Sequence, residues 1–335
     1  MTKTILLTGI TGFIAKRIAH DLLKAGYSVT GTVRSAARET EVLTALRSHG
    51  IDDAALSRLR FVSLDLTADA GWTQAMAGID AVVHCASPFP TAQPADEMVL
   101  IRPAVDGTLR VLRAAQAAGV HRVVLTSSME AVMHGAKSGP VTEADWSDLT
   151  APTASAYTKS KTLAERAAWD FCTAHPAMQL TVINPGLVLG TPMDNATGSS
   201  IGVIRRFLHG KDPMVPDVCV PISDLADVSA AHLAALAQPI SIGKRYIVAD
   251  RVMTMPEVTG ILKAAYPQRR IPTRIAPRFV LRLLALFDAE VRLILPWLGW
   301  KMVLDNTRIR TELGLAITPA EQSIMGTARF VTAAA

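Results

Sequence analysis

The feature that most constrains the fold of this chain is the repeated alternation of short β-branched runs with longer segments of helical periodicity. The apolar runs are typical of buried strands in a parallel sheet and lie at residues 4–8, 28–33, 60–64, 81–85, 122–126 and 180–184. Helical spacing of apolar residues occurs between them, at residues 14–25, 98–118 and 156–175. This alternation predicts an α/β fold with a doubly wound parallel sheet.

Beyond Pro185 the alternation is lost, because glycine and proline recur at short intervals as far as residue 221. We therefore predict a discontinuous division into two domains. The sheet domain comprises residues 1–185 and about 218–249. A smaller, mostly helical substrate-binding domain comprises about 186–217 and 250–335.

Charge and hydropathy exclude two classes of partner. The formal net charge is +5, and the basic residues are scattered along the chain, so no nucleic acid is expected to bind. The apolar stretch 279–303 is interrupted by Arg282, Asp288 and Pro296. It is predicted to be an amphipathic helix at a cleft or subunit contact, and no membrane partner is expected.

The cysteines Cys85, Cys172 and Cys219 are far apart and lack the spacing of a disulfide framework or a zinc site. This predicts a reducing compartment and no metal. The amino terminus runs into the first strand without a signal-peptide pattern, so we expect a cytoplasmic location. The expected partner is a small-molecule substrate, and both a monomer and a homodimer remain open.

A glycine-rich turn follows the first predicted strand, in the segment Thr8-Gly9-Ile10-Thr11-Gly12-Phe13-Ile14-Ala15. Gly9 permits a tight turn, Gly12 lets the backbone approach a pyrophosphate, and Ala15 allows the helix to pack closely on the strand. The helix amino terminus offers N–H groups to the anion. The turn predicts a Rossmann fold that binds a dinucleotide, with Gly9, Thr11, Gly12, Phe13 and Ile14 at the cofactor.

The end of the second predicted strand bears on the choice between NAD and NADP. NAD enzymes usually carry an acid there, for the ribose hydroxyls, whereas Val33 is followed here by Arg34. A guanidinium pairs bidentately with a phosphate, and Arg38 is a second candidate four residues later. We therefore predict NADP(H), with Arg34 and Arg38 at its additional phosphate.

Tyr157 and Lys161 are four residues apart in a predicted helix and therefore share one face. A neighbouring ammonium favours the phenolate and is expected to lower the pKa of the tyrosine, which then serves as acid and base. Lys161 is also expected to hold the nicotinamide ribose. The pair follows a strand that ends in Thr126-Ser127-Ser128, which strengthens the interpretation.

With these residues the sequence resembles the extended short-chain dehydrogenase/reductase family. Within that family it is similar to the branch of dihydroflavonol reductases, cinnamoyl-CoA reductases and yeast-type aldehyde or methylglyoxal reductases. The resemblance covers nearly the whole chain. It is carried by the glycine-rich turn, Val33-Arg34-Ser35, Asp65-Leu66, His84-Cys85-Ala86-Ser87-Pro88-Phe89, Leu125-Thr126-Ser127-Ser128, Tyr157-x-x-x-Lys161, Asn184-Pro185-Gly186 and Arg308-x-x-x-Glu312-Leu313-Gly314.

The resemblance implies a role for several positions. It places Asp65 and Leu66 near adenine, Ala86 and Ser87 beside the ribose and phosphates, and Pro185 and Val188 beside the nicotinamide. It also implies that Ser128 is the catalytic serine that polarises the substrate carbonyl while Tyr157 protonates the oxygen. Ser127 is the alternative. The substrate residues expected from the pattern are Phe89, Ser128, Met133 and Tyr157.

The implied activity is NADPH-dependent reduction of an aldehyde or ketone to an alcohol. Two other enzyme classes are alternatives, an NAD-dependent sugar-nucleotide epimerase and a hydroxysteroid-type dehydrogenase. Glu130 follows Met129, which cannot transfer a proton, so the acid–base run of sugar-nucleotide dehydratases is incomplete here. A non-enzymatic dinucleotide sensor is a third alternative, which retention of Tyr157 and Lys161 disfavours.

Overall fold

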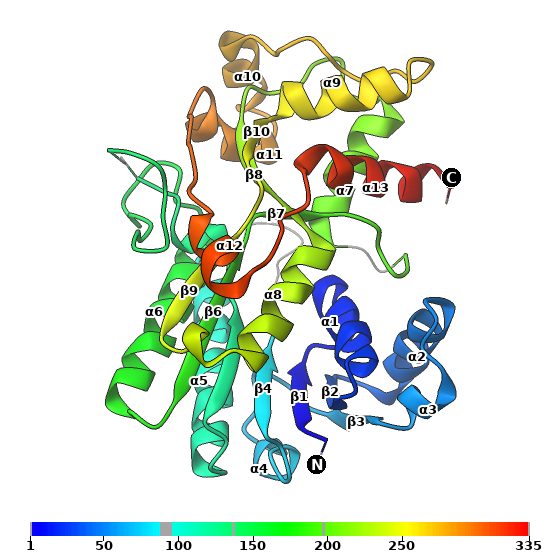
Figure 1. Cartoon of the computed structure of the whole chain (residues 1–335). Coiled ribbons are helices and arrows are strands. Elements are labelled where there is room, and N and C mark those ends of the chain that lie inside the picture. The colour runs from blue at the N-terminus through cyan, green and yellow to red at the C-terminus, as the bar shows by residue number, and fades with distance from the viewer. Residues whose placement is uncertain (1, 88–95, 136–137, 196–197, 334–335) are drawn as a thin grey trace.

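The computed structural model describes residues 2–87, 96–135, 138–195 and 198–333. Its main sheet has seven parallel strands in the order β3-β2-β1-β4-β5-β6-β9 (Figure 1). They are β1 (Thr4–Thr8), β2 (Ser28–Val33), β3 (Leu59–Ser63), β4 (Ala81–His84), β5 (Arg122–Thr126), β6 (Gln179–Pro185) and β9 (Lys244–Val248). The predicted doubly wound sheet is confirmed. The strand order reverses between β1 and β4, which in such sheets is where ligands bind.

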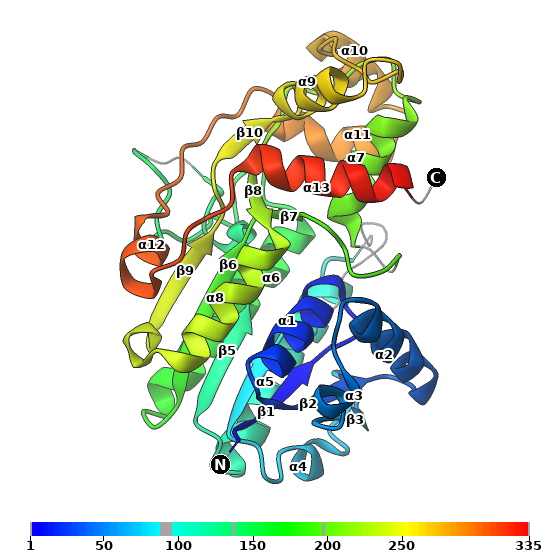
Figure 2. The same ribbon diagram turned by 45° about the vertical axis from the view of Figure 1, so that its right-hand side comes forward.

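Helices cover both faces of this sheet (Figure 2). Alternate residues of a strand point to opposite faces, and β1 illustrates the result. Ile5 and Leu7 belong to the core beneath α1 (Phe13–Lys24) and α8 (Leu225–Ala237). Leu6 belongs to the core beneath α5 (Met98–Ala117) and α6 (Ala156–Ala174). The remaining elements of this half are η1 (Ala36–Arg38), α2 (Glu39–Ser48), α3 (Asp53–Leu56), α4 (Trp72–Ala75), η2 (Met129–Ala131), η3 (Pro239–Ser241) and α12 (Thr307–Leu313).

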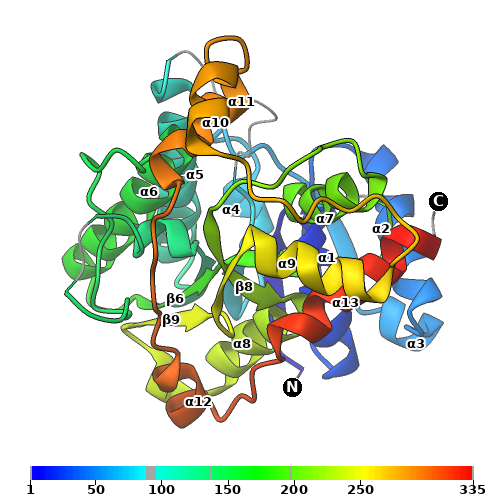
Figure 3. The ribbon, with the colours of Figure 1, turned by 90° about the horizontal axis from the view of Figure 1, so that it is seen from above.

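A second, three-stranded sheet with the order β10-β8-β7 lies beyond the carboxyl ends of the main strands (Figure 1). Figure 3 shows this end of the molecule from above. Its strands are β7 (Leu187–Leu189), β8 (Cys219–Asp224) and β10 (Val252–Thr254). Three helices share a separate apolar core with these strands: α7 (Ser199–His209), α9 (Met255–Ala265) and α13 (Ala320–Ala333). The chain passes repeatedly between the two sheets, so the boundaries of the two predicted domains stay a prediction.

The prediction of one amphipathic helix over 279–303 is wrong. The segment forms α10 (Arg278–Leu284), α11 (Ala289–Ile294) and η4 (Leu295–Trp297). The side chain of Asp288 accepts a hydrogen bond from the Val291 amide and so starts a new helix, while Pro296 lacks the N–H that a continuing helix needs. No helix in the described ranges is both long enough and apolar enough to cross a membrane.

Candidate active site

A cleft of about 300 Å³ opens between the carboxyl ends of the main strands and the second sheet. Its walls come from the turn after β1, the ends of β4, β5 and β6, one face of α6 and the start of α7. Ten of the predicted site residues line it together, namely Gly9, Gly12, Phe13, Ile14, Ser87, Ser128, Tyr157, Lys161, Pro185 and Val188. Tertiary structure thus joins residues that are up to 179 positions apart in the sequence, from Gly9 to Val188.

Several cleft residues were not among the predicted site residues. Cys85 follows β4, Thr126 ends β5, and Gly186 joins β6 to β7. Ser127, the predicted alternative to Ser128, also lines the cleft. Each is adjacent in the sequence to a predicted residue, so a position at the end of a strand is the signal that could have identified it. The start of α7, with Gly198, Ser199 and Ser200, had no motif that pointed to it.

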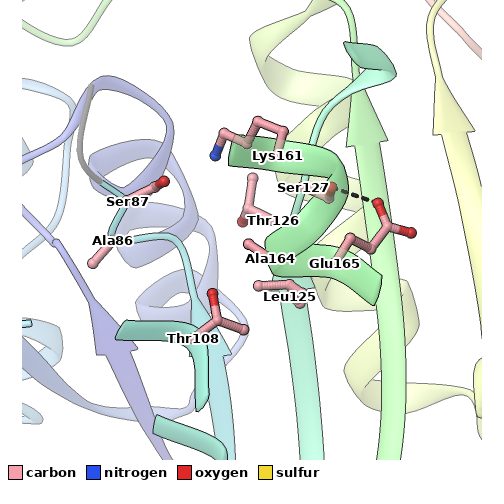
Figure 4. Close-up of a pocket in the computed structure, with 9 residues that line it drawn as sticks. All are labelled: Ala86, Ser87, Thr108, Leu125, Thr126, Ser127, Lys161, Ala164 and Glu165. Atoms are coloured by element: carbon pink, nitrogen blue, oxygen red, sulfur yellow. Dashed lines mark hydrogen bonds between the residues drawn. The ribbon is translucent and has the colours of Figure 1, made fainter. Parts of the chain in front are cut away.

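Other predicted residues do not line this cleft. Thr11 lies in the turn between β1 and α1, and Ala86 lines a smaller cavity beside Ser87 and Lys161 (Figure 4). Met133 is buried in an apolar cluster with Trp297 and does not line the cleft. Phe89 falls outside the described residues.

The glycine-rich turn has the geometry expected of a backbone cradle. Gly9 has a φ of 69°, in the left-handed region, and a Cβ there would lie 3.0 Å from the Ala86 Cα. The Gly12 amide donates to the Gly9 carbonyl at 2.8 Å, which closes the turn. Gly12 then precedes α1 without a side-chain cap. The first turn of α1 therefore presents its amides without a capping side chain.

The two predicted phosphate-binding arginines differ in their surroundings. Arg38 Nε donates to Glu41 Oε2 at 2.6 Å, and Glu41 also pairs with buried Lys16 at 2.8 Å. Arg34 is exposed after β2 and makes no hydrogen bond or ion pair with the residues that the structure describes. An anion in solution would therefore meet Arg34 more readily than Arg38.

Asp65 and Leu66 lie just after β3, near Arg34. Hydrogen bonds from the amide and hydroxyl of Thr67 hold the pKa of exposed Asp65 below its usual range, and the charge of Arg34 contributes in the same direction. The carbonyl of Leu66 accepts a hydrogen bond from Arg110 at 2.6 Å. Both residues therefore lie in a rigid turn beside the predicted arginine.

Helix α6 begins with a capping box that fixes its first turn. Ser155 Oγ accepts from the Thr158 amide at 3.1 Å, and Thr158 Oγ1 accepts from the Ser155 amide at 3.2 Å. Tyr157 therefore lies in an ordered turn, and Lys161 follows one turn later, with its Nζ 5.8 Å from the Tyr157 ring centre. Ser128 lines the cleft with Tyr157 and lowers the pKa of the tyrosine in part. A serine, a tyrosine and a lysine thus meet in the cleft.

The expected lowering of the Tyr157 pKa is not what the structure shows. Burial raises the pKa of Tyr157 well above its usual range, and the negative charge of Glu130 raises it further, while Ser128 lowers it in part. Burial also lowers the pKa of Lys161 to about 8. Desolvation outweighs charge attraction at this pair, so Tyr157 keeps its proton at neutral pH.

The structure distinguishes the two candidate serines. Ser127 Oγ donates to Glu165 Oε2 at 2.5 Å in the interior, whereas Ser128 faces Tyr157. Glu130 does not line the cleft, because its carboxylate accepts from Thr158 Oγ1 at 2.5 Å and lies 2.9 Å from His134 Nε2. The arrangement favours Ser128 as the cleft hydroxyl.

The sequence is similar to a known protein family and to several characterised reductases. Residues 5–249 match the NAD dependent epimerase/dehydratase family. The chain is 33% identical over 288 residues to anthocyanidin reductase ((2S)-flavan-3-ol-forming) of Vitis vinifera, covering 81% of this chain and 83% of that relative. It is 34% identical over 277 residues to cinnamoyl-CoA reductase 1 of Arabidopsis thaliana, covering 81% of this chain and 77% of that relative.

Among solved structures, the fold is similar to that of the yeast methylglyoxal/isovaleraldehyde reductase Gre2 complexed with NADPH. The TM-score is 0.81 at 27% sequence identity, and the match covers 98% of both chains. Gre2 from Candida albicans, also in complex with NADPH, gives a TM-score of 0.81 at 26% identity over 99% of both chains.

Proposed function

Because the chain belongs to the NAD dependent epimerase/dehydratase family, we propose that it is an NADPH-dependent reductase that converts an aldehyde or ketone to an alcohol. The observation that carries the proposal is that Ser128, Tyr157 and Lys161 line one cleft together with the glycine-rich turn. The relatives named above are reductases, and Gre2 binds NADPH. The site and these relatives support reduction of a carbonyl compound.

The residues present fit a dinucleotide phosphate cofactor. The turn at Gly9 and Gly12 leaves no side chain between the backbone and a pyrophosphate, and the uncapped start of α1 presents amides to it. Exposed Arg34 supplies a guanidinium for the additional phosphate of NADP. Asp65, Leu66, Ala86 and Ser87 would border the adenosine half, and Pro185 and Val188 the nicotinamide half. When bound, the cofactor supplies the hydride.

Ser128 and Tyr157 act on the carbonyl oxygen of the substrate. This oxygen gains negative charge as the carbon accepts hydride, and donors already in place stabilise that charge. Ser128 donates a hydrogen bond to the oxygen, and Tyr157 transfers its hydroxyl proton to it. The raised pKa of Tyr157 keeps that proton available in the resting enzyme. Met133, buried in its own cluster, is not needed at the substrate.

Lys161 has two roles in this proposal. Its ammonium hydrogen-bonds the nicotinamide ribose, and its positive charge, 5.8 Å from the Tyr157 ring centre, stabilises the phenolate that remains after proton transfer. The second role requires the protonated amine.

The test is cofactor consumption by the purified protein with a panel of aldehydes, ketones, diketones and dihydroflavonols, run in parallel with NADPH and NADH. Oxidation of NADPH in the presence of a carbonyl compound is the expected result. Binding of NADPH without turnover on this panel, together with turnover of a sugar nucleotide or a steroid, would contradict the proposal. Binding without any turnover would favour a dinucleotide sensor.

Three further predictions from the sequence remain proposals. They are the division into two domains, the cytoplasmic location and a monomeric or homodimeric state. Limited proteolysis, fractionation of the source cell and light scattering test them in that order.

A further inference from the structure

Helix α6 carries a buried carboxylate one turn after Lys161. The side chain of Glu165 is 0% exposed, and it borders the small cavity that Lys161 and Ser127 also line (Figure 4). Burying a carboxylate costs several kcal/mol unless partners compensate it. A fully buried acid beside the candidate catalytic residues therefore needs an explanation.

Glu165 connects α6 to three strands of the main sheet. Its Oε2 accepts from Ser127 Oγ, at the end of β5, at 2.5 Å and from Asn184 Nδ2, in β6, at 2.8 Å. Its Oε1 accepts from Arg245 Nε, in β9, at 2.5 Å. Since these strands are neighbours in the sheet, one carboxylate fixes the helix against all three.

The network also reaches the backbone of Ser128. Asn184 Nδ2, which donates to Glu165, donates as well to the Ser128 carbonyl at 3.0 Å. The side-chain amide of Asn184 therefore links the backbone of Ser128 to the carboxylate that fixes α6. The distance between the Ser128 and Tyr157 side chains thus depends on Glu165 from both sides.

Arg245 is itself held firmly. Its guanidinium lies 4.0 Å from the ring centre of Trp146 and donates to the carbonyls of Glu143 at 3.0 Å and Asp145 at 2.6 Å. The ion pair therefore has a fixed geometry, which is the condition under which a buried pair orients its surroundings.

We propose that Glu165 is a positioning residue of the reduction, which fixes the helix that carries Tyr157 and Lys161 against the strand end that carries Ser128. The inference rests on the proposed function and deepens it. Glu165 does not touch the substrate. It acts through Ser127, Asn184 and the register of α6.

The carboxylate also acts on Lys161 through its charge. The groups that face Lys161 are Tyr157 and Glu165 on its own helix and His84 and Cys85 at the end of β4. Burial lowers the pKa of His84 to about 3 and raises that of the Cys85 thiol to about 12, so both are neutral near pH 7. The charge of Glu165 raises the pKa of Lys161, against the larger lowering by burial.

The experiment compares Glu165→Gln, which removes the charge, with Glu165→Asp, which keeps it. For each folded variant we would measure kcat, KM for a carbonyl substrate, the Kd of NADPH, and kcat/KM against pH. Because a misplacement of about 1 Å can cost roughly 10²-fold in rate, kcat of Glu165→Gln is expected to fall by about that factor, with the Kd of NADPH nearly unchanged. The alkaline limb of the kcat/KM profile of Glu165→Gln should move to lower pH.

The conservative variant separates charge from position. Glu165→Asp shortens the side chain but retains the anion, so kcat should fall while the alkaline limb stays at its original pH. Ser127→Ala is the matched control, since it removes one hydrogen bond and leaves the carboxylate. The alkaline limb of the kcat/KM profile of Ser127→Ala should also stay at its original pH.

Glu165→Gln leaves Arg245 buried without its counter-ion and can fail to fold for that reason. The double variant Glu165→Gln, Arg245→Gln removes both charges and serves in that case, with the same expected fall in kcat and a smaller shift of the alkaline limb, because the opposing charge of Arg245 is lost as well. If the folded variant has the wild-type kcat and an unchanged alkaline limb in its pH profile, the role of Glu165 is overturned while the proposed function stands. A wild-type protein that reduces no carbonyl compound would overturn the proposed function, and the inference with it.

Discussion

The Nζ of Lys161 lies 5.8 Å from the centre of the Tyr157 ring, in the cleft that Ser128 also lines. Tyr157→Phe removes the proton donor and leaves the ring in place. General acid catalysis contributes about 10²–10⁴-fold, so kcat should fall by roughly that factor. The Kd of NADPH, measured by fluorescence, should hardly change. Near-normal turnover by this variant would exclude the proposed mechanism.

Activity is expected to fall as the pH rises through about 8. Burial lowers the pKa of Lys161 to about 8, and the mechanism needs the protonated amine, which is present below that pH and lost above it. The pKa of Tyr157 is raised, so its hydroxyl adds no limb in this range. The measurement is kcat/KM against pH at saturating NADPH. A profile that stays flat to pH 10 would contradict the assignment of Lys161.

The two neighbouring serines should respond differently to replacement by alanine. Loss of a donor to a developing oxyanion costs about 10²–10³ in kcat, and Ser128→Ala should fall in this range. Ser127→Ala removes a hydrogen bond to Glu165 in the interior and should cost less than Ser128→Ala. Steady-state kinetics on both variants decide the matter, and the reverse order would assign the catalytic role to Ser127.

Preference for NADPH should depend on Arg34 more than on Arg38. A hydrogen-bonded charge contributes about 1.5–3 kcal/mol, so Arg34→Gln should weaken NADPH binding by roughly 10- to 100-fold and leave NADH binding unchanged. Arg38→Gln is the matched control, because that guanidinium is already paired with Glu41. Titration with both cofactors measures the effect. Equal losses in the two variants would show that the arginines share the phosphate.

Gly9 and Gly26 offer a matched test of the turn. Both have a positive φ, but a Cβ on Gly9 would crowd Ala86, whereas a Cβ on Gly26 would meet no atom within 4 Å. Each change to alanine should cost about 1–2 kcal/mol of folding free energy through strain alone. Gly9→Ala should cost more and should also weaken NADPH binding. Urea unfolding and cofactor titration provide the two measurements, and identical behaviour of the variants would show that the contact with Ala86 is unimportant.

Local pattern was sufficient for most of the main sheet. Each predicted strand ends within one residue of its counterpart in the structure, and so does each of the three predicted helices. Short β-branched runs and helical spacing are local properties, so neighbouring residues carry the signal. The second sheet was missed because β7 and β10 have three residues each, which is too short for a period to appear.

The glycine-rich turn, Arg34, Tyr157 and Lys161 were predicted as site residues from residue type and short spacing, whereas Ser128 was implied by the family resemblance, with Ser127 as the alternative. Tertiary structure alone decided which serine faces the tyrosine, since Ser127 is engaged by Glu165, 38 residues later. It likewise reversed the expected direction of the Tyr157 pKa, because desolvation depends on burial by distant segments. Residue type and spacing identified the candidate groups, whereas packing determined which of them lie together and in what protonation state.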